Sequence, residues 1–421
     1  MNNQNKKNTG RFGLPLEIKY CSKCNISNQR PTTTNEYKHS KNTSQVTIEF
    51  DENNVCWACK VNAKKWDGNI DWKEREKELV EICNKYRNLP GQYNCLVGGS
   101  GGKDSVYQSH ILKYKYGMRP LTVTWSPHMY TEIGWRNFQS WIHKGGFDNY
   151  LFTTNGIVNR HLTKRSLINL LHPFQPFILG QKAWPTKMAY MFDIPIIFYG
   201  ESPSENGVKI NNEKTFSKTG EDIHEGFVDD PIGATKIEDI MLGGEPIASH
   251  VDQGYDINEF KSYLPLEPEK IREKKIETHY LGYYLKWIPQ ENFYYAVDKT
   301  GFETAPERID GTYQKHVSMD DKADNFHFYT YYIKFGMGRA MTESASDIRN
   351  GLITKEEGLG LIKQFDGGFP KKYEKDFLEY ISMSREEFDE LCDKFRPEHI
   401  WEKKSNRWEH KLPPWEYFEK N

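Results

Sequence analysis

Six consecutive residues, Ser-Gly-Gly-Lys-Asp-Ser at positions 100–105, have the composition of a phosphate-binding loop. Glycines let backbone N–H groups converge on an anion without obstruction by a Cβ atom. The serines add hydroxyl donors, and the lysine adds a positive charge. The loop follows an apolar run at 93–97 and precedes a helical pattern, so a helix N-terminus adds unpaired donors and a favourable dipole. The residue types and their order therefore predict a site for the phosphates of a nucleotide.

Two familiar phosphate-binding motifs do not describe this loop. A Walker A motif places Gly five residues before its Gly-Lys pair, and Ser or Thr directly after it. Here the pair is Gly102-Lys103, the earlier position is Val97 and the following residue is Asp104. The dinucleotide fingerprint GxGxxG fails as well, because its last glycine would stand at Asp104. The loop is a different kind of phosphate cradle.

Four of the seven cysteines form two CxxC pairs, Cys21 with Cys24 and Cys56 with Cys59. Each CxxC turn points two thiolates at one ion, and two such turns complete a tetrahedron around Zn²⁺. The stretch between the pairs is longer than the common ribbon spacing, so iron–sulfur or redox use stays open as an alternative. A closed four-sulfur site has no open coordination position, and we expect it to serve folding or docking. The remaining cysteines are expected to be buried packing residues: Cys83, Cys95 and Cys392.

The elements that must position these groups follow an α/β rhythm. Apolar runs predict strands at 93–97, 121–125, 149–154 and 195–199, separated by helical patterns. Strands at this spacing favour a parallel sheet with right-handed crossovers. One helix is expected at about 103–116, and another is expected to run to about 192 with Pro185 in its first turn.

Changes in composition along the chain predict four units. They are a small zinc-ribbon-like unit at 1–66, an ATP-binding domain at 67–204, an insertion or mobile cover at 205–275, and a C-terminal substrate or partner region at 276–421. A plain surface excursion is the alternative for 205–275. In the first unit only residues 45–50 suggest a strand. A charged helix that begins at Asp71 is expected to link this unit to the next domain. In the mainly helical C-terminal region, Ser384 and Glu387 mark a helix start.

Charge and hydropathy narrow the class of protein. Basic and acidic residues nearly cancel, 57 against 59, and no basic stripe stands out, so we expect no nucleic-acid partner. No apolar run approaches the ~18 residues of a membrane span. The N-terminus is polar and lacks the apolar stretch of a signal peptide. We therefore expect a cytoplasmic protein without a membrane span.

The loop, in its strand–loop–helix context, resembles the signature of the PP-loop ATP pyrophosphatase superfamily, whose fold is adenine nucleotide alpha hydrolase-like. Other segments resemble one family within it, the N-acetyl sugar amidotransferases of bacterial surface-glycan pathways (the WbpG and PseA type). These are the double CxxC, the segment Phe-Tyr-Gly-Glu-Ser-Pro at 198–203, Lys-Phe-Gly-Met-Gly-Arg at 334–339 and Asp-Ile-Arg-Asn-Gly at 347–351. The resemblance runs over nearly the whole chain, apart from 211–275.

The resemblance implies an ATP-dependent reaction that converts the acetamido group of a sugar to an acetamidino group. The amide oxygen is adenylylated with release of pyrophosphate, and ammonia then displaces it as AMP. A separate HisH-like glutaminase subunit, of the imidazole-glycerol-phosphate synthase type, would supply the ammonia, with room for a HisF-like subunit beside it. The implied substrate is nucleotide-linked or a nonulosonic acid, in lipopolysaccharide or O-antigen biosynthesis. ATP, Mg²⁺ and structural Zn²⁺ are the implied cofactors.

The same resemblance assigns the loop residues to ATP. The phosphates would be held by Gly99, Ser100, Gly101, Gly102, Lys103 and Ser105. Asp104 either helps to position Mg²⁺ or caps the following helix.

Further candidates lie beyond the loop, and each has a structural alternative. Trp125 stands where superfamily members contact adenine through the backbone, or else it packs in the core. Glu201, just past a strand, either contacts substrate, ammonia or metal, or caps a loop. Arg339 either clamps an anionic group of the substrate or forms a structural ion pair. Lys182 and Lys187 could reach AMP or the sugar, but a solvated position is the simpler expectation. Lys103, Asp104, Glu201 and Arg339 are the predicted catalytic residues.

Two other functions fit parts of the pattern. A PP-loop tRNA thiolase also combines zinc ribbons with this loop, but it would want a catalytic cysteine near ATP and a basic face. A non-catalytic nucleotide-binding module would bind ATP and release no pyrophosphate with any substrate.

Overall fold

A parallel sheet of five strands forms the centre of the chain in the computed structural model, which describes residues 9–32, 35–207 and 240–420. The strands are β1 (Cys95–Gly98), β2 (Pro120–Trp125), β3 (Asn149–Phe152), β4 (Ile196–Tyr199) and β7 (Glu277–Tyr280). Their order is β3-β2-β1-β4-β7, and every neighbouring pair is parallel. The predicted α/β class with a parallel sheet is confirmed. The edge strand β7 was not predicted, because its sequence, Glu-Thr-His-Tyr, contains no apolar run.

Helices cover both faces of this sheet, and the alternation of side chains along each strand explains why. Val97 of β1 points toward α2 (Trp72–Arg87) and α3 (Lys103–Tyr114), where Phe198 of β4 joins it. The neighbouring residue Leu96 points to the opposite face, against α6 (Gln175–Met191). A strand buried on both sides reads as a continuous apolar run, which is the pattern that the sequence shows. Three more helices complete this part: α4 (Glu132–Gly145), α5 (Gly156–Leu170) and α11 (Pro289–Thr300).

Two local predictions are wrong. The helix α6 begins at Gln175 with Pro176 in its first turn, so Pro185 lies inside the helix. The ring of Pro185 packs against the end of β1, where a Cβ atom on Gly98 would lie 3.3 Å from its Cγ. Residues 45–50 form no strand either, and their ladder is reduced to isolated bridges at Thr47 and Phe50.

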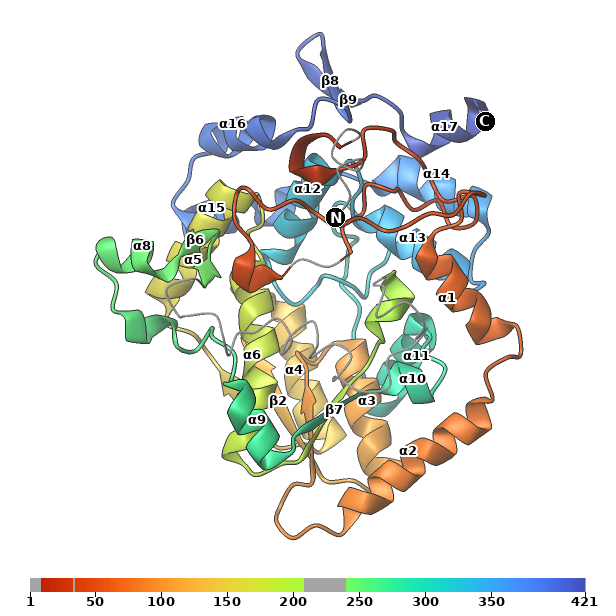
Figure 1. Cartoon of the computed structure of the whole chain (residues 1–421), viewed down its shortest axis with the longest axis vertical. Coiled ribbons are helices and arrows are strands. Elements are labelled where there is room, and N and C mark those ends of the chain that lie inside the picture. Colours follow the sequence, from red (N-terminus) through yellow and green to blue (C-terminus); the bar gives the residue numbers. More distant parts are fainter. Residues whose placement is uncertain (1–8, 33–34, 208–239, 421) are drawn as a thin grey trace.

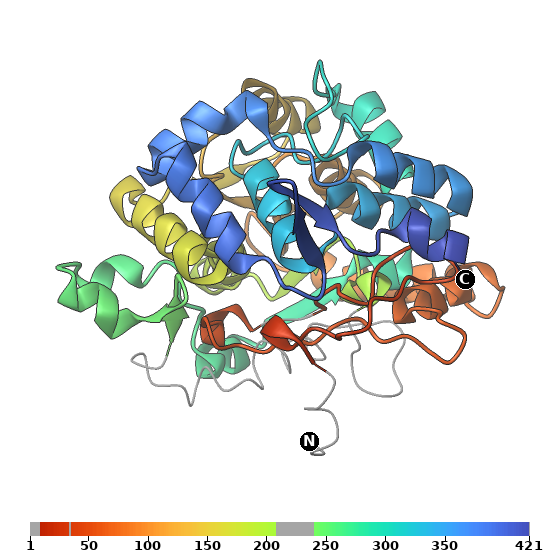
Figure 2. The same cartoon turned by 90° about the horizontal axis from the view of Figure 1, so that it is seen from above.

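In its described residues the N-terminal unit has one α-helix, α1 (Trp57–Trp66), and otherwise short 3-10 helices, bridges and turns. It shares one apolar core with α12 (Asp324–Phe335), α13 (Arg339–Arg349) and α14 (Lys355–Phe365), in which Tyr20 and Ile26 pack with Met337 and Met341. Figures 1 and 2 both show the red N-terminal segment lying along the blue C-terminal elements. The unit is therefore held by the C-terminal region as well as by its own turns.

The C-terminal region is mainly helical, as predicted. It continues through α10 (Leu281–Tyr284), α15 (Glu374–Ile381), α16 (Arg385–Phe395) and α17 (Pro414–Lys420), with a hairpin of β8 (Trp401–Lys404) and β9 (Arg407–His410). Ser384 caps α16 in a capping box with Glu387, which confirms the predicted helix start.

Part of the expected insertion at 205–275 lies outside the described residues. Its described portion contains the 3-10 helix η4 (Pro203–Asn206) at one end and then β5 (Met241–Leu242), β6 (Glu245–Pro246), α8 (Ile247–Asp252) and α9 (Pro268–Lys274). Of the helices in the described ranges, none has the length and apolar character needed to cross a bilayer.

Candidate active site

Hydrogen bonds fix the loop between β1 and α3, and no side chain caps the helix that follows it. Thr124 donates to the carbonyl of Gly99 at 2.7 Å, and the backbone N–H of Ser100 donates to Ser105 Oγ at 3.1 Å. The N-cap of α3 is Gly102, which offers no side chain to the first N–H groups of the helix. These donors and the positive end of the helix dipole remain directed at the space above the loop.

Gly101 cannot be replaced without moving the loop. Its φ is +86°, a conformation that favours glycine, and a Cβ atom there would lie 2.6 Å from Phe138 Cα. The close approach to α4 explains why the loop needs a glycine at this position, beyond the access that it gives to a phosphate.

A cavity of about 160 Å³ lies against this loop. One wall is formed by residues 100–104 and by Gly134 and Asn137 of α4. The opposite wall comes from far along the chain, from residues 316–320 and Arg339. The loop and the C-terminal region thus enclose the candidate active site together.

Lys103 and Asp104 form a contact at the edge of the cavity. The ammonium group of Lys103 donates to Asp104 Oδ2, and Asn292 Nδ2 donates to Oδ1 at 2.9 Å. The Asp104 carboxylate is therefore not the helix cap, which is Gly102. Mg²⁺ in phosphate-transfer sites is usually held by one or two carboxylates and the phosphates themselves, and Asp104 has the position and chemistry for that.

Glu201 lies at the point where the direction of the strand order reverses. The chain runs from β1 outward to β3 and then returns to place β4 on the other side of β1. Open α/β sheets bind ligands beyond the carboxyl ends of such a pair of strands. The side chain of Glu201 is accessible, and partial desolvation together with Asp104 raises its pKa, against the opposing effects of Asn206 and Lys103. Glu201 and the loop residues are therefore electrostatically coupled.

A buried ion pair holds the Glu201 segment to the N-terminal unit. Lys65 at the end of α1 donates to Glu205 Oε2 at 2.7 Å and to Asn350 Oδ1 at 3.2 Å. Both members of the ion pair are almost fully buried, and Glu205 Oε1 has no hydrogen-bond partner. Burial raises the pKa of Glu205 to about 7, although Lys65 acts in the opposite direction. No sequence pattern marks this pair, because its members are far apart in the chain.

Replacing Lys65 by methionine should destabilise the protein by about 3–5 kcal/mol, because Glu205 would stay buried without its cation. Chemical denaturation measures this, and the double variant with Glu205→Gln should recover part of the loss. Since the pKa of Glu205 is raised from 4.5 to about 7, its contribution to stability falls as the pH rises through that interval. The Glu205→Gln variant should lack that decline; an equal decline in both proteins would exclude Glu205 as its source.

Arg339 begins α13 and lies in the wall of the cavity. Its Nε donates to Glu343 Oε1 at 2.5 Å, and its guanidinium lies 4.2 Å over the ring of Phe328. Burial opposes its charge, but Glu343 and Asp324 outweigh burial and raise the pKa of Arg339. The side chain thus forms the structural ion pair that we considered and also lines the cavity.

Two acidic residues near Arg339 were missed by the sequence analysis. Asp320 lies in the cavity wall and interacts with Ser100 of the loop, and burial raises its pKa. Burial also raises the pKa of Asp324 to about 6, against the effect of Arg339. They belong to a stretch with no recognisable motif, and folding alone brings them to the loop.

Trp125 and the two lysines lie in packed surroundings. The Trp125 ring is 4% exposed and packs on Phe152 at 5.0 Å and against Gly180, so its side chain belongs to the core. Lys187 is half-buried and donates to the carbonyls of residues 261 and 262, and burial lowers its pKa to about 8. Burial also lowers the pKa of Lys182. Neither lysine has the solvated position that we expected.

The four cysteines converge on one point. The Sγ atoms of Cys21 and Cys59 are 3.8 Å apart, those of Cys24 and Cys56 are 3.7 Å apart, and all four lie within 4.8 Å of one another. Four sulfurs bound at ~2.3 Å to a single tetrahedral ion are about 3.8 Å apart. The four cysteines therefore have the spacing of a metal-binding site.

This site is buried and hydrogen-bonded from outside. The backbone N–H groups of Lys23 and Cys56 donate to Cys21 Sγ, and Arg349 donates to Cys24 Sγ at 3.7 Å. In the part of the chain that the structure describes, this is the one cluster of three or more metal-ligating side chains. The remaining cysteines are buried and unpaired, as predicted: Cys83, Cys95 and Cys392.

The C-terminal segment that contains Arg339 matches a known family model. Residues 310–414 match the family model described as "LPS biosynthesis protein WbpG-like, C-terminal domain". This stretch is similar to that domain, and we call it the WbpG-like domain. The WbpG-like domain contributes Asp320 and Arg339 to the loop cavity, and it contains α12, α13 and α14 that hold the N-terminal unit.

Other comparisons cover smaller parts or show weaker similarity. An uncharacterized protein of Methanocaldococcus jannaschii is 32% identical over 85 residues, so the match spans 20% of this chain and 29% of that relative. Among solved structures, the NH3-dependent NAD synthetase of Campylobacter jejuni aligns with 57% of this chain and 100% of its own at 11% identity and a TM-score of 0.27. The U34-tRNA thiolase NcsA of Methanococcus maripaludis aligns over 79% and 86% of the two chains at 10% identity and a TM-score of 0.23. At these TM-scores the fold assignment rests on the sheet and the loop themselves.

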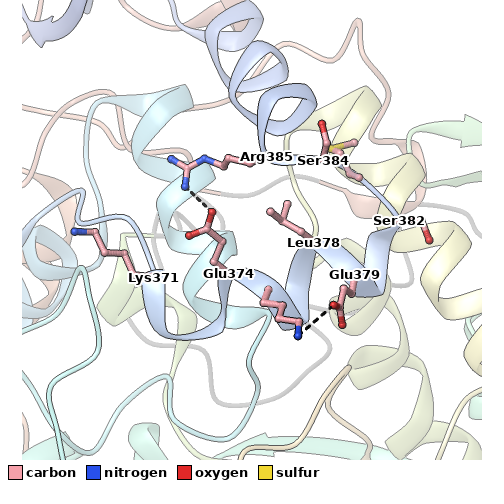
Figure 3. Close-up of a pocket in the computed structure, with 9 residues that line it drawn as sticks. Lys371, Glu374, Leu378, Glu379, Ser382, Ser384 and Arg385 are labelled. Carbon is pink, nitrogen blue, oxygen red and sulfur yellow. Dashed lines mark hydrogen bonds and ion pairs between the residues drawn. The ribbon is translucent and has the colours of Figure 1, made fainter.

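A larger hollow lies elsewhere, between α15 and α16 (Figure 3). Four of its charged side chains form two ion pairs, Arg385 with Glu374 at 2.8 Å and Lys375 with Glu379 at 3.8 Å. It contains none of the predicted site residues, so we assign the chemistry to the loop cavity.

Proposed function

We propose that the chain is an ATP-using enzyme of lipopolysaccharide biosynthesis that converts an acetamido group of a sugar to an acetamidino group. The observation that carries this proposal is the shared cavity, in which the phosphate-binding loop faces the WbpG-like domain. An acetamide carbon is a poor electrophile and its oxygen is a poor leaving group. Activation by ATP is therefore the chemical step that such a conversion requires.

The proposed reaction balances in two steps. The amide oxygen attacks the α-phosphorus of ATP, pyrophosphate leaves, the amide nitrogen loses its proton, and an O-adenylyl imidate forms. Ammonia then attacks the imidate carbon, the C–O bond breaks, AMP leaves with the original amide oxygen, and a nitrogen-bound proton is lost. The amidine product takes up a proton at neutral pH, so a neutral group becomes a cation.

Each step has residues to support it. The loop N–H groups and Lys103 would hold the departing pyrophosphate, and Asp104 would hold the Mg²⁺ that neutralises it. Arg339 would contact an anionic part of the substrate from the opposite wall. Glu201, with its raised pKa, would accept the proton that the attacking ammonia loses. The four cysteines would hold a structural Zn²⁺.

The ammonia would come from a separate glutaminase subunit of the HisH-like type, with a HisF-like subunit as an optional further component. Free ammonia is mostly protonated at neutral pH and is then not a nucleophile. Direct delivery from a bound partner keeps it unprotonated. We place the reaction in the cytoplasm, where ATP and glutamine are available.

The assay combines the purified, metal-loaded chain with ATP, Mg²⁺, an ammonium salt and a panel of UDP-N-acetyl sugars and nonulosonic acids. The expected result is sugar-dependent release of pyrophosphate and AMP, and a product about one mass unit lighter, because O is replaced by NH. A tRNA pool is the comparison substrate. AMP formation with tRNA and with no acetamido sugar would support a thiolase instead, although Cys95 lies fully buried within β1 and cannot act as its cysteine.

Glu201→Gln should lower product formation about 100-fold or more, while sugar-dependent exchange of pyrophosphate into ATP continues. The glutamine side chain cannot accept the proton from ammonia, but adenylylation of the substrate does not need that proton transfer. Glu379→Gln on the exposed face of α15 is the matched control and should leave both rates unchanged. If exchange and product formation fell equally, Glu201 would act in substrate or metal binding and not as the proton acceptor.

A further inference from the structure

A second cavity, of about 80 Å³, lies beneath the N-terminal unit and shares no lining residue with the loop cavity. Its walls come from Pro31 and from residues between 36 and 45, from the turn between α5 and α6, and from α12. Most of the lining side chains are polar: Glu36, His39, Gln45, His172, His327, Tyr331 and Lys334. We call this cavity the α12 chamber. None of its residues has a role in the reaction proposed above.

Lys334 is the unusual member of this chamber. It is 4% exposed, and its ammonium group donates to the carbonyl of Leu170 at 2.9 Å. The ring of Phe12 lies 4.7 Å away, but within the described ranges no carboxylate forms an ion pair with Lys334. A lysine has three donors, so two of them have no hydrogen-bond acceptor. Buried charges in proteins are normally paired or bind a ligand.

Two histidines in the chamber have unsatisfied ring nitrogens as well. The rings of His172 and His327 are 4.8 Å apart, and the Nδ1 atom of each is buried without a hydrogen-bond partner. Buried polar atoms in native proteins rarely lack a partner. The two histidine rings and Lys334 therefore line a small space with polar atoms that lack hydrogen-bond partners.

The single carboxylate of the chamber is already engaged. Glu36 Oε2 lies 3.0 Å from His39 Nδ1, and Oε1 lies 3.6 Å from His172 Nε2. Burial would raise the pKa of Glu36, but His172 and His39 outweigh burial and hold the pKa well below its usual value. Burial lowers the pKa of Lys334 to about 8, although the Glu36 carboxylate acts in the opposite direction without forming an ion pair with it. The chamber therefore has free donors and no free anionic acceptor.

We propose that the α12 chamber binds an oxyanion group of the substrate, a sugar carboxylate or a phosphate, on Lys334 between His172 and His327. This inference rests on the proposed function, which supplies the sugar substrate. The volume suits such a group but not a whole sugar. Both cavities involve α12, because His327 lines the chamber and the neighbouring Phe328 contacts the Arg339 guanidinium of the loop cavity. The substrate of the enzyme is then an anionic sugar.

The test needs no turnover. Lysines of the metal-loaded full chain are acetylated with a trace of acetic anhydride at pH 8, and the extent at Lys334 is read by mass spectrometry. The probes are inorganic phosphate, N-acetylneuraminate as a carboxylated sugar and N-acetylglucosamine as a neutral one, at constant ionic strength in chloride. We expect phosphate or N-acetylneuraminate to reduce labelling of Lys334 at least fivefold, and the neutral sugar to leave it unchanged. Lys375, which is exposed on α15, reports the reactivity of an ordinary lysine.

Two variants separate this site from the loop. In Lys103→Met, protection of Lys334 should persist, because the phosphate that protects it is not the one bound at the loop. Lys334→Met should raise the KM for the anionic sugar at least tenfold with the KM for ATP unchanged, and Lys334→Arg should restore part of the binding. Since Lys334 lacks an ion pair, the Met variant should keep its Tm.

The outcomes are distinct from those of the function assay. No protection by either anion, or equal protection by the neutral sugar, would overturn the anion site even if acetamido sugars provoke pyrophosphate release. Protection of Lys334 in a protein that releases no pyrophosphate with any sugar would support the anion site and count against the proposed function.

Discussion

Lys103→Met should reduce sugar-dependent pyrophosphate release by roughly two to three orders of magnitude, the cost of removing one preorganised charge from a developing anion. Lys103 is the first residue of α3, and its ammonium group lies in the cavity with the loop backbone. In the proposed first step negative charge collects on the leaving pyrophosphate. The glycines and the helix N-terminus remain in the variant, so ATP binding should weaken less than the rate falls.

The measurement is pyrophosphate release against ATP concentration, with circular dichroism to verify the fold. Lys113→Met is the matched control, because Lys113 lies on the same helix but points its ammonium group to the carbonyl of Gly146 at the surface. The control should retain nearly full activity. A Lys103→Met enzyme with a normal rate and only a higher KM for ATP would show that the lysine binds the ground state and not the transition state.

Removal of the metal should unfold the N-terminal unit. Zinc binding to four thiolates contributes about 10–16 kcal/mol in small zinc-finger peptides at pH 7. The described part of the unit has a single α-helix and little ladder structure, so without the metal only its packing on the C-terminal region would hold it. Because Lys65 then loses its position against Glu205, the Glu201 segment should lose its support, and activity should fall with stability.

The experiment compares the wild type with Cys56→Ser, by elemental analysis, thermal unfolding and sugar-dependent AMP formation. We expect one zinc per wild-type chain, a colourless protein, and a Tm lower by more than 10 °C in the variant, since several kcal/mol are lost. Cys83→Ala, a buried cysteine outside the cluster, should keep its zinc and lose only about 1–2 kcal/mol. Broad visible absorption and bound iron in the wild type would contradict the zinc assignment.

Local sequence determines much of the half of the chain that contains the parallel sheet and the loop. Apolar runs predicted β1 to β4. Of these, β1, β2 and β4 are buried on both faces, and such a strand has few alternatives to a run of apolar residues. The loop was recognisable because glycines, serines and a lysine together are needed at a phosphate, and a clash with Phe138 further restricts Gly101. The double CxxC was recognisable for a similar reason, because a tetrahedral ion requires its ligands at fixed short spacing.

The same local reasoning fails where a tertiary contact decides. Pro185 reads as a helix start, but its packing on the end of β1 places it inside α6. The strand β7 is polar, and pairing with β4 rather than apolar burial defines it. Trp125 fitted an adenine contact or the core equally well, and the packing around Gly180 places its ring in the core.

By itself, the sequence determined the parallel α/β class, the phosphate loop and the four-cysteine site, since each depends on residues that are close together in the chain. Only the tertiary structure brought Asp320 and Arg339 to the loop, paired Lys65 with Glu205, and left Lys334 buried in the α12 chamber without an ion pair. The physical reason is distance along the chain. These residues lie in separate segments that no sequence pattern links. Their contacts form only when the sheet, the N-terminal unit and the WbpG-like domain pack together.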